Sequence, residues 1–396
     1  MSNIREYTKK KEQKNTGNYG QKIRQHRLSI FYRASLAVVI AVALCVLIVV
    51  QIKNRVFEGY QVVSSIEREN ISGTRNLNYN GAILTYSKDG AHCSNTKGDV
   101  LWNQTYEMQA PIVETSKSMA AIADYNGSTI YVMNTEKILG EIKTNMPIKG
   151  LSVSASGLVA AVLDEADVTW IYLYSSTGET IAYFKTLMKT NGYPMDVSIS
   201  DSGALVAVSY LYVDSGSITS KVAFYNFGKV GQNVVDNLVS GYDYTNHVMP
   251  RVQFMDNATA FGVADDRLVF YSGDQKPMPI KEILLSADVQ SFYYNENYVG
   301  LVYLNVSGES KYKIDIYNKE GELVMSKFFD IEFTDIEFTK EKMIIYNDME
   351  CLIQNIGGVE NFAGDFEKGV QLVIPTASSY KYILITEDSI DTIELK

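Results

Sequence analysis

The residues that could support metal or thiol chemistry are few and far apart in this chain. It contains three histidines, His26, His92 and His247, and three cysteines, and no pair of them has the spacing of a zinc site or a Cys-x-x-Cys motif. Metal-activated and thiol mechanisms both need several ligands close together. The sequence therefore predicts no metal site, and we expect His92 and His247 to lie at the surface.

Carboxylates are plentiful, but their spacing does not indicate catalysis. The densest group is Asp164, Glu165 and Asp167, which we interpret as a solvated loop, with a weak cation site as the alternative. Residues 200–203 (SDSG) lack the aromatic end of a sialidase-type Asp box. The chain also has no phosphate-binding loop, nucleophile elbow or dinucleotide fingerprint. We expect no catalytic residues and no cofactor.

The elements that must position these side chains are short β-prone runs that recur along residues 61–396. Each repeat contains an apolar run that fits the second strand of a four-stranded unit, and successive runs begin 37 to 53 residues apart. These runs are 82–86, 119–123, 158–162, 205–209, 258–262, 298–302, 343–346 and 382–385. Third strands rich in Tyr, Val and Ile follow many of them, as in residues 169–174 and 313–317.

Eight units of this size predict an all-β, eight-bladed β-propeller, with seven blades as the alternative. The last unit has room for about three strands only. Residues 61–66 (QVVSSI) could supply its missing outer strand and close the ring, which would remove exposed sheet edges.

Residues 98–102 (GDVLW) are similar to the turn and strand of a PQQ-type blade. With the repeats, they make the chain resemble membrane-anchored propellers of the PQQ-repeat-like and WD40-like class, particularly an uncharacterised family of Gram-positive bacteria. The chain has only two Trp and no Trp-Asp dipeptide, so the repeated Trp docking and the signature of those classes are missing.

The loops between repeats suggest a binding surface. In a propeller, loops between second and third strands and connections from fourth to first strands emerge on one face, which we call the loop face. The longest of these predicted excursions are residues 185–196, 210–220, 241–250 and 304–311. They predict a Tyr-rich recognition surface, because Tyr combines apolar area with a polar tip. Its candidate ligand-binding residues are Tyr193, Tyr210, Tyr212, Tyr242, Tyr244, His247 and Arg251.

Residues 34–52 form an uncharged apolar stretch between Arg33 and Lys53. A helix of this length rises about 28 Å, which matches the hydrocarbon core of a bilayer. Residues 1–33 carry nine basic and two acidic residues, whereas the residues after the stretch carry 27 basic and 44 acidic ones, a formal charge of −17. The positive-inside rule predicts a single-pass cell-membrane protein with a cytoplasmic N-terminus and an extracytoplasmic C-terminal domain.

These observations divide the chain into four parts. They are a disordered basic tail (1–33), a transmembrane signal anchor (34–52), a linker (53–60) and an extracytoplasmic propeller (61–396). The tail is expected to touch anionic lipid headgroups, and an acidic outer domain argues against nucleic acid as a partner. If residues 61–66 form an outer strand, the short linker would turn the loop face away from the membrane.

The preferred functional hypothesis is a non-enzymatic binding or scaffold module for an unknown protein or cell-envelope component. Two alternatives remain open: a propeller enzyme or quinone-cofactor protein that uses the central channel, and a sensor that signals through its cytoplasmic tail.

Overall fold

The computed structural model describes residues 3–69, 73–165, 168–187, 192–214, 216–306 and 308–396. The chain forms two compact units, Met1–Arg55 and Val56–Lys396. The first contains one long helix, α1 (Asn3–Lys53), and the second consists almost entirely of β-strands. Each unit is described by itself.

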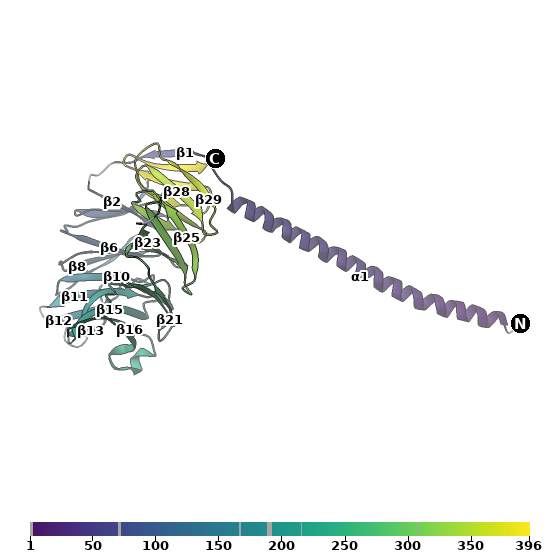
Figure 1. Ribbon diagram of the computed structural model, residues 1–396, viewed down its shortest axis with the longest axis horizontal. Helices are drawn as coiled ribbons and strands as arrows, with labels where there is room; N and C mark the ends of the chain where they lie inside the picture. Colours follow the sequence, from purple (N-terminus) through teal and green to yellow (C-terminus); the bar gives the residue numbers. More distant parts are fainter. Residues whose placement is uncertain (1–2, 70–72, 166–167, 188–191, 215, 307) are drawn as a thin grey trace. The chain divides into compact units, whose positions relative to one another are not determined.

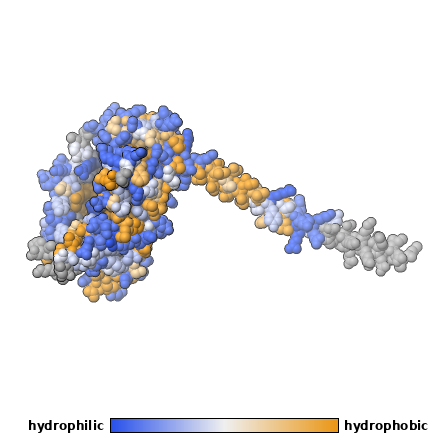
Figure 2. All heavy atoms as spheres, in the orientation of Figure 1, coloured by the Kyte–Doolittle hydropathy of each residue, from blue (hydrophilic) through white to orange (hydrophobic). Residues whose placement is uncertain are grey.

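Helix α1 is long and apolar enough, over Tyr19–Lys53, to cross a membrane. Its apolar side chains are exposed, and Figure 2 shows them as a continuous hydrophobic surface along the second half of the helix. The basic segment that was expected to be disordered belongs to this helix from Asn3 onward. Its many Lys, Arg, Gln and Glu residues have high helix propensity and no Pro interrupts it, which accounts for the difference.

Within the described residues, the second unit forms eight four-stranded antiparallel sheets, which are the blades of an eight-bladed propeller (Figure 1). The eight-bladed prediction is confirmed, and the seven-bladed alternative is wrong. In each blade the first strand in chain order lies innermost, next to the central channel, except that the last blade takes its outer strand from the start of the unit.

The strands of blades 1 to 4 are β2 (Arg75–Tyr79), β3 (Ala82–Tyr86), β4 (Gly90–Ser94) and β5 (Val100–Thr105); β6 (Pro111–Ser116), β7 (Met119–Asp124), β8 (Thr129–Asn134) and β9 (Ile138–Lys143); β10 (Ile148–Val153), β11 (Val159–Glu165), β12 (Val168–Tyr174) and β13 (Thr180–Leu187); and β14 (Tyr193–Ile199), β15 (Leu205–Asp214), β16 (Ser217–Asn226) and β17 (Leu238–Thr245). Two 3-10 turns, η1 (Gly231–Asn233) and η2 (Val235–Asn237), lie between β16 and β17.

The strands of blades 5 to 8 are β18 (Arg251–Phe254), β19 (Thr259–Val263), β20 (Arg267–Ser272) and β21 (Met278–Leu284); β22 (Val289–Tyr294), β23 (Tyr298–Leu304), β24 (Tyr312–Asn318) and β25 (Leu323–Phe329); β26 (Asp335–Phe338), β27 (Lys342–Tyr346), β28 (Glu350–Asn355) and β29 (Glu360–Asp365); and β30 (Val370–Pro375), β31 (Lys381–Thr386) and β32 (Ser389–Leu395), with β1 (Tyr60–Glu67) as the outer strand.

The ring is closed by the pairing of the first strand with the last one. β1 runs antiparallel to β32, from Tyr60 opposite Leu395 to Glu67 opposite Ser389, and Figure 1 shows it beside the C-terminus. The N–H of Gly59 donates to the carbonyl of Lys396, and the N–H of Lys396 donates back. The predicted closing strand at residues 61–66 is therefore confirmed.

The core lies between neighbouring blades. The second strands supply its densest part, because they pack against a blade on each side and small residues allow close approach. In β7, for example, Ala121 and Ala123 face blade 3 and Ala120 and Ile122 face blade 1, and all four are fully buried. This packing holds the innermost strands in place around the channel.

Candidate functional site

Blade 4 carries all five tyrosines predicted from sequence, but on strands rather than loops. Pairing of β15 with β16 continues to Asp214 opposite Ser217, and pairing of β16 with β17 continues to Thr219 opposite Thr245. The second predicted excursion (210–220) and the first half of the third (241–250) are thus a projecting part of the sheet, whereas the described residues of the fourth (304–311) lie mainly in the loop between β23 and β24. Residues 188–191 of the first excursion, residue 215 of the second and residue 307 of the fourth lie outside the described residues. Strand residues include Tyr193, Tyr210, Tyr212, Tyr242 and Tyr244.

Two of these tyrosines are in the core instead of on the surface. Tyr210 is buried with its hydroxyl 2.8 Å from that of Tyr225, and Tyr244 is buried with its hydroxyl 2.6 Å from that of Tyr271. Burial raises the pKa of Tyr210 and of Tyr244. Both phenols already have partners, so neither is available to a ligand.

Tyr212 and Tyr242 remain partly exposed, and both fasten the projecting sheet. The Tyr212 hydroxyl lies 3.5 Å from the carboxylate of Asp243, and the Tyr242 hydroxyl donates to the carbonyl of Pro277 at 3.0 Å. The second bond joins blade 4 to blade 5. The projecting end of β15 also exposes apolar surface at Val213, whose side chain is 70% exposed.

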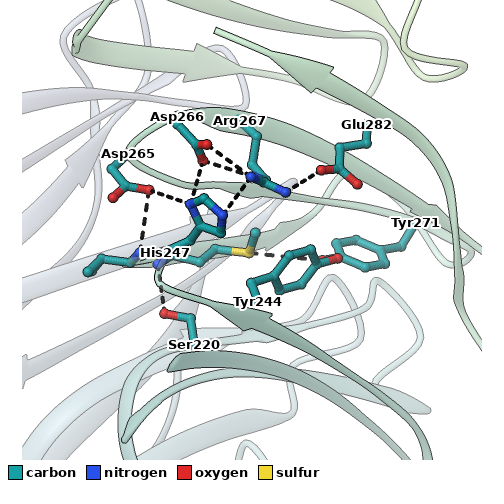
Figure 3. A network of polar contacts seen from close by, with 10 residues as sticks. Ser220, Tyr244, His247, Asp265, Asp266, Arg267, Tyr271 and Glu282 are labelled. Atoms are coloured by element: carbon teal, nitrogen blue, oxygen red, sulfur yellow. Dashed lines mark hydrogen bonds and ion pairs between the residues drawn. The ribbon is translucent and has the colours of Figure 1, made fainter. Parts of the chain in front are cut away.

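His247 belongs to a network of charged residues on the loop face (Figure 3). It follows β17, and the turn before β20 brings Asp265 and Asp266 against it. Its Nδ1 atom lies 3.1 Å from Asp266 and 3.8 Å from Asp265, and its Nε2 atom lies 2.7 Å from the guanidinium of Arg267. Arg267 also pairs with Asp266 at 2.8 Å and with Glu282.

The network has three side chains that could bind a cation, the imidazole of His247 and the carboxylates of Asp265 and Asp266, but its hydrogen bonds do not suit a cation. A guanidinium only donates, so Nε2 of His247 must accept the bond from Arg267. The ring proton is then on Nδ1, where it points to Asp266. A metal ion at Nδ1 would need that proton to move to Nε2, against the N–H of Arg267. We therefore interpret the network as a structural anchor for the connection between blades 4 and 5.

Tyr193 and Arg251 come together at the mouth of the central channel. They line a loop-face pocket of about 330 Å³, which also contains Tyr125, Lys149 and Asp196, and which we call the mouth pocket. Arg251 lies 3.6 Å from the Asp196 carboxylate, which also accepts hydrogen bonds from the N–H of Val252 and the amide of Gln253. Burial nevertheless raises the pKa of Asp196 to about 6.

Lys149 forms the opposite wall of the mouth pocket. Its ammonium lies 5.4 Å from the centre of the Tyr125 ring and 3.7 Å from Asp164. Asp164, the second-last residue of β11, is therefore in contact with a cation, whereas Ala166 and Asp167 of the predicted acidic loop lie outside the described residues. The mouth pocket combines two cations, two tyrosines and the exposed side chain of Met195.

Below the mouth, the channel holds a polar cavity of about 500 Å³. The innermost strands of seven blades line it near their last residues, with Asn78, Glu114, Ser152, Ser198, Gln253, Tyr294 and Glu337. The Glu337 carboxylate accepts a hydrogen bond of 2.8 Å from Asn78, and the Tyr294 hydroxyl donates to Gln253 at 3.1 Å. The channel is thus a ring of hydrogen-bonding groups.

Two carboxyl groups of this ring titrate near neutral pH. Burial and, to a smaller extent, the charge of Asp196 raise the pKa of Glu114 to about 7, although Arg251 acts in the opposite direction. Burial also raises the pKa of Glu337 to about 7, against the hydrogen bond from Asn78. Sequence reasoning missed this ring. The available signal was a polar residue near the end of the first strand in seven of the eight units, paired with an apolar second strand.

The two cysteines of the second unit are isolated. Cys93 in β4 and Cys351 in β28 are buried free thiols, and burial raises the pKa of Cys93 to about 11. His92, next to Cys93, is partly buried, and burial lowers its pKa.

Comparison with solved structures identifies propellers of low sequence identity. Sqt1 from Chaetomium thermophilum is 10% identical, covering 85% of this chain and 100% of its own, with a TM-score of 0.51. BamB from Moraxella catarrhalis is 11% identical and covers 85% of this chain and 100% of its own, with a TM-score of 0.48. Apo AztD from Citrobacter koseri is 9% identical and covers 76% of this chain and 86% of its own, with a TM-score of 0.47. At these identities the similarity to Sqt1 shows the fold alone.

No curated protein matches the chain significantly in sequence. The sequence profile of a family of unknown function (DUF5711) matches residues 53–395. This match begins before the closing strand β1 and ends at the last residue of β32, so it includes all eight blades. The chain therefore belongs to the DUF5711 family.

Proposed function

We propose that this protein is a membrane-anchored, extracytoplasmic binding module that takes up a protein or cell-envelope partner at the mouth pocket, without catalysing a reaction. The observation that carries the proposal is the meeting of Tyr193, Arg251, Tyr125 and Lys149 at one opening on the loop face. Aromatic side chains and Arg dominate binding energy at protein interfaces, particularly when they lie around a concave site.

The cellular location rests on charge and length. Residues 34–52 would anchor the protein in the cell membrane, the basic tail would lie in the cytoplasm against anionic lipid headgroups, and the acidic propeller would lie outside. The resemblance to anchored propellers of Gram-positive bacteria is consistent with this location. The closing strand β1 starts at the end of its blade opposite the loop face. This direction supports the proposal that the mouth pocket points away from the bilayer.

The test is site-specific photocrosslinking in intact membranes. A photoreactive amino acid replaces Tyr193 in the mouth pocket or, as a matched control, Tyr183 of β13, which is 60% exposed and does not line the mouth pocket. We expect a discrete crosslinked species from position 193 and none from position 183, and we expect Arg251→Gln to weaken it.

Equal crosslinking at positions 193 and 183, or none at 193 and a strong product at 183, would contradict the proposed site. Mass spectrometry of the crosslinked species would then identify the partner class, protein or envelope polymer.

A further inference from the structure

A second loop-face pocket lies between blades 1 and 2. It has a volume of about 460 Å³ and adjoins the mouth pocket at Ile112 and Tyr125, which line both. We call it the Arg75 pocket. Its lining includes Arg75, Tyr86, Lys88, Gln109, Pro111 and Tyr125.

The wall from blade 1 is basic. Arg75 is the first residue of β2 and lies directly opposite Tyr86 of β3, so both side chains are on the sheet face that packs against blade 2. Lys88 follows in the tight turn between β3 and β4, where the N–H of Ser87 donates to the carbonyl of Gly90 at 2.9 Å. The fold thus places both cations at one edge of the blade.

The wall from blade 2 is largely apolar and is fixed by hydrogen bonds. It consists of Ala110, Pro111 and Ile112 at the start of β6, with Tyr125 after β7. The Asp124 carboxylate accepts bonds from the N–H of Gln109 at 3.0 Å and of Ala110 at 2.7 Å. The two walls are tied together, because the N–H of Met108 donates to the carbonyl of Lys88 at 2.8 Å.

The charges of this pocket are unbalanced. Arg75 and Lys88 are exposed and form no ion pair with the described residues, and the lining has no carboxylate. By contrast, the channel cavity is lined by Glu114, Glu296, Glu337 and Asp201 with a single cation, Lys117, which pairs with Asp201 at 2.6 Å. In a domain with a formal charge of −17, two unpaired cations beside an apolar wall form a local site for an anion.

We propose that the Arg75 pocket binds an organic oxyanion, that is, a phosphate or carboxylate group attached to an organic body. The anionic oxygens lie between Arg75 and Lys88, which supply charge-assisted hydrogen bonds, and the organic body packs on Pro111, Ile112 and Tyr125. The volume falls in the range of small-molecule sites, about 300–1,000 Å³. This site goes beyond the proposed function, because it has its own ligand and its own pocket.

The oxyanion could belong to a free small molecule or to an end or repeat unit of an anionic polymer. Both would offer the pocket the same group, an anionic oxyacid attached to an organic body. Isothermal titration calorimetry of the full chain in detergent micelles would use three probes: inorganic phosphate, glycerol 1-phosphate and a short oligomer of glycerol phosphate. We expect glycerol 1-phosphate to bind more tightly than inorganic phosphate, because it can use the apolar wall. Tighter binding of the oligomer would assign the site to a polymer, and equal binding to a free metabolite.

The variants are Arg75→Gln and Lys88→Gln, with Lys97→Gln as the matched control. Lys97 is an exposed lysine of the same blade in the turn between β4 and β5, away from the loop face. We expect each pocket variant to weaken binding about tenfold, which corresponds to about 1.4 kcal/mol, and the control to bind like the unmodified chain.

The proposal is overturned if the unmodified chain binds none of the probes, or if Lys97→Gln weakens binding as much as the pocket variants. It is also overturned if Arg75→Gln and Lys88→Gln have no effect. A failure here leaves the crosslink at position 193 unchanged, so it can be told apart from a failure of the mouth pocket as a partner site.

Discussion

At the scale of single residues, Glu114 makes a clear prediction about pH. A carboxyl group whose pKa is about 7 in the folded chain, and about 4.5 when unfolded, keeps its proton in the fold at pH values where the unfolded chain has lost it. Stability therefore falls as the pH rises from about 4.5 to about 7, by roughly 3 kcal/mol, and then levels off.

Replacing Glu114 with Gln should remove this penalty. We expect Glu114→Gln to raise the melting temperature at pH 8.5 and to change it little at pH 4.5, measured by thermal unfolding in one buffer series. Glu296→Gln is the matched control, because Glu296 is an exposed carboxylate that lines the same cavity. A gain that is equal at both pH values, or equal in the control, would assign the effect to something other than the buried charge.

Arg267 makes a second prediction at this scale. Its guanidinium bonds Asp266, Glu282 and His247 at once, with a side chain only 16% exposed. A lysine keeps the charge but cannot reproduce this geometry. Arg267→Lys should lower the free energy of unfolding by about 1–2 kcal/mol in chemical denaturation. Arg251→Lys, at a 54% exposed arginine with one contact at 3.6 Å, should cost well under about 1 kcal/mol. Similar losses in both variants would argue against the network as an anchor.

At the scale of elements, the closing pair β1 and β32 is the feature to test. Most side chains of β1 are exposed, so its attachment depends mainly on main-chain hydrogen bonds and the strand can fray. Gln61 and Glu394 are direct partners, at a separation that a disulfide can bridge. The double variant Gln61→Cys, Glu394→Cys should be more stable when oxidised, by about 2–4 kcal/mol, because the bond closes a very long loop.

The measurement compares denaturation of the same variant with and without reductant. The native thiols Cys93 and Cys351 are buried and should not interfere. If oxidation leaves the midpoint unchanged while mass spectrometry confirms the bond, then unfolding does not begin at this closing pair.

The elements also show how far the sequence could be interpreted. The apolar second strands recur with enough regularity to reveal eight blades, and residues 61–66 could be assigned because the last unit was one strand short. The strand ends of blade 4 could not be predicted, since Tyr- and Thr-rich runs suit both a long hairpin and a loop. The ring of polar residues in the channel could not be predicted, because each of seven blades contributes one such residue from a short first strand. The contact of His247 with Asp265 and Asp266 joins two blades, and no local spacing encodes it.

At the scale of the whole molecule, topology is the central prediction. Single cysteines at Val213 (70% exposed, in the projecting hairpin of the loop face) and at Val235 (82% exposed, in η2 between β16 and β17) should both react with an impermeant maleimide on intact cells. A loop face that points outward should make position 213 react faster than position 235. Labelling only after the cells are opened would place the propeller in the cytoplasm and contradict the positive-inside assignment.

Ring closure also imposes a temporal order on the synthesis of the chain. Glu67 ends β1, and Ser389 begins its partner strand about 320 residues later. At about 5–20 residues per second, β1 waits roughly 15–65 s for its partner to be made. By the end of that interval seven blades can be complete while the ring is still open. A chain released before β32 is finished would therefore contain nearly every residue but lack the full pairing of β1 with β32. Proteases and chaperones can recognise such an open ring.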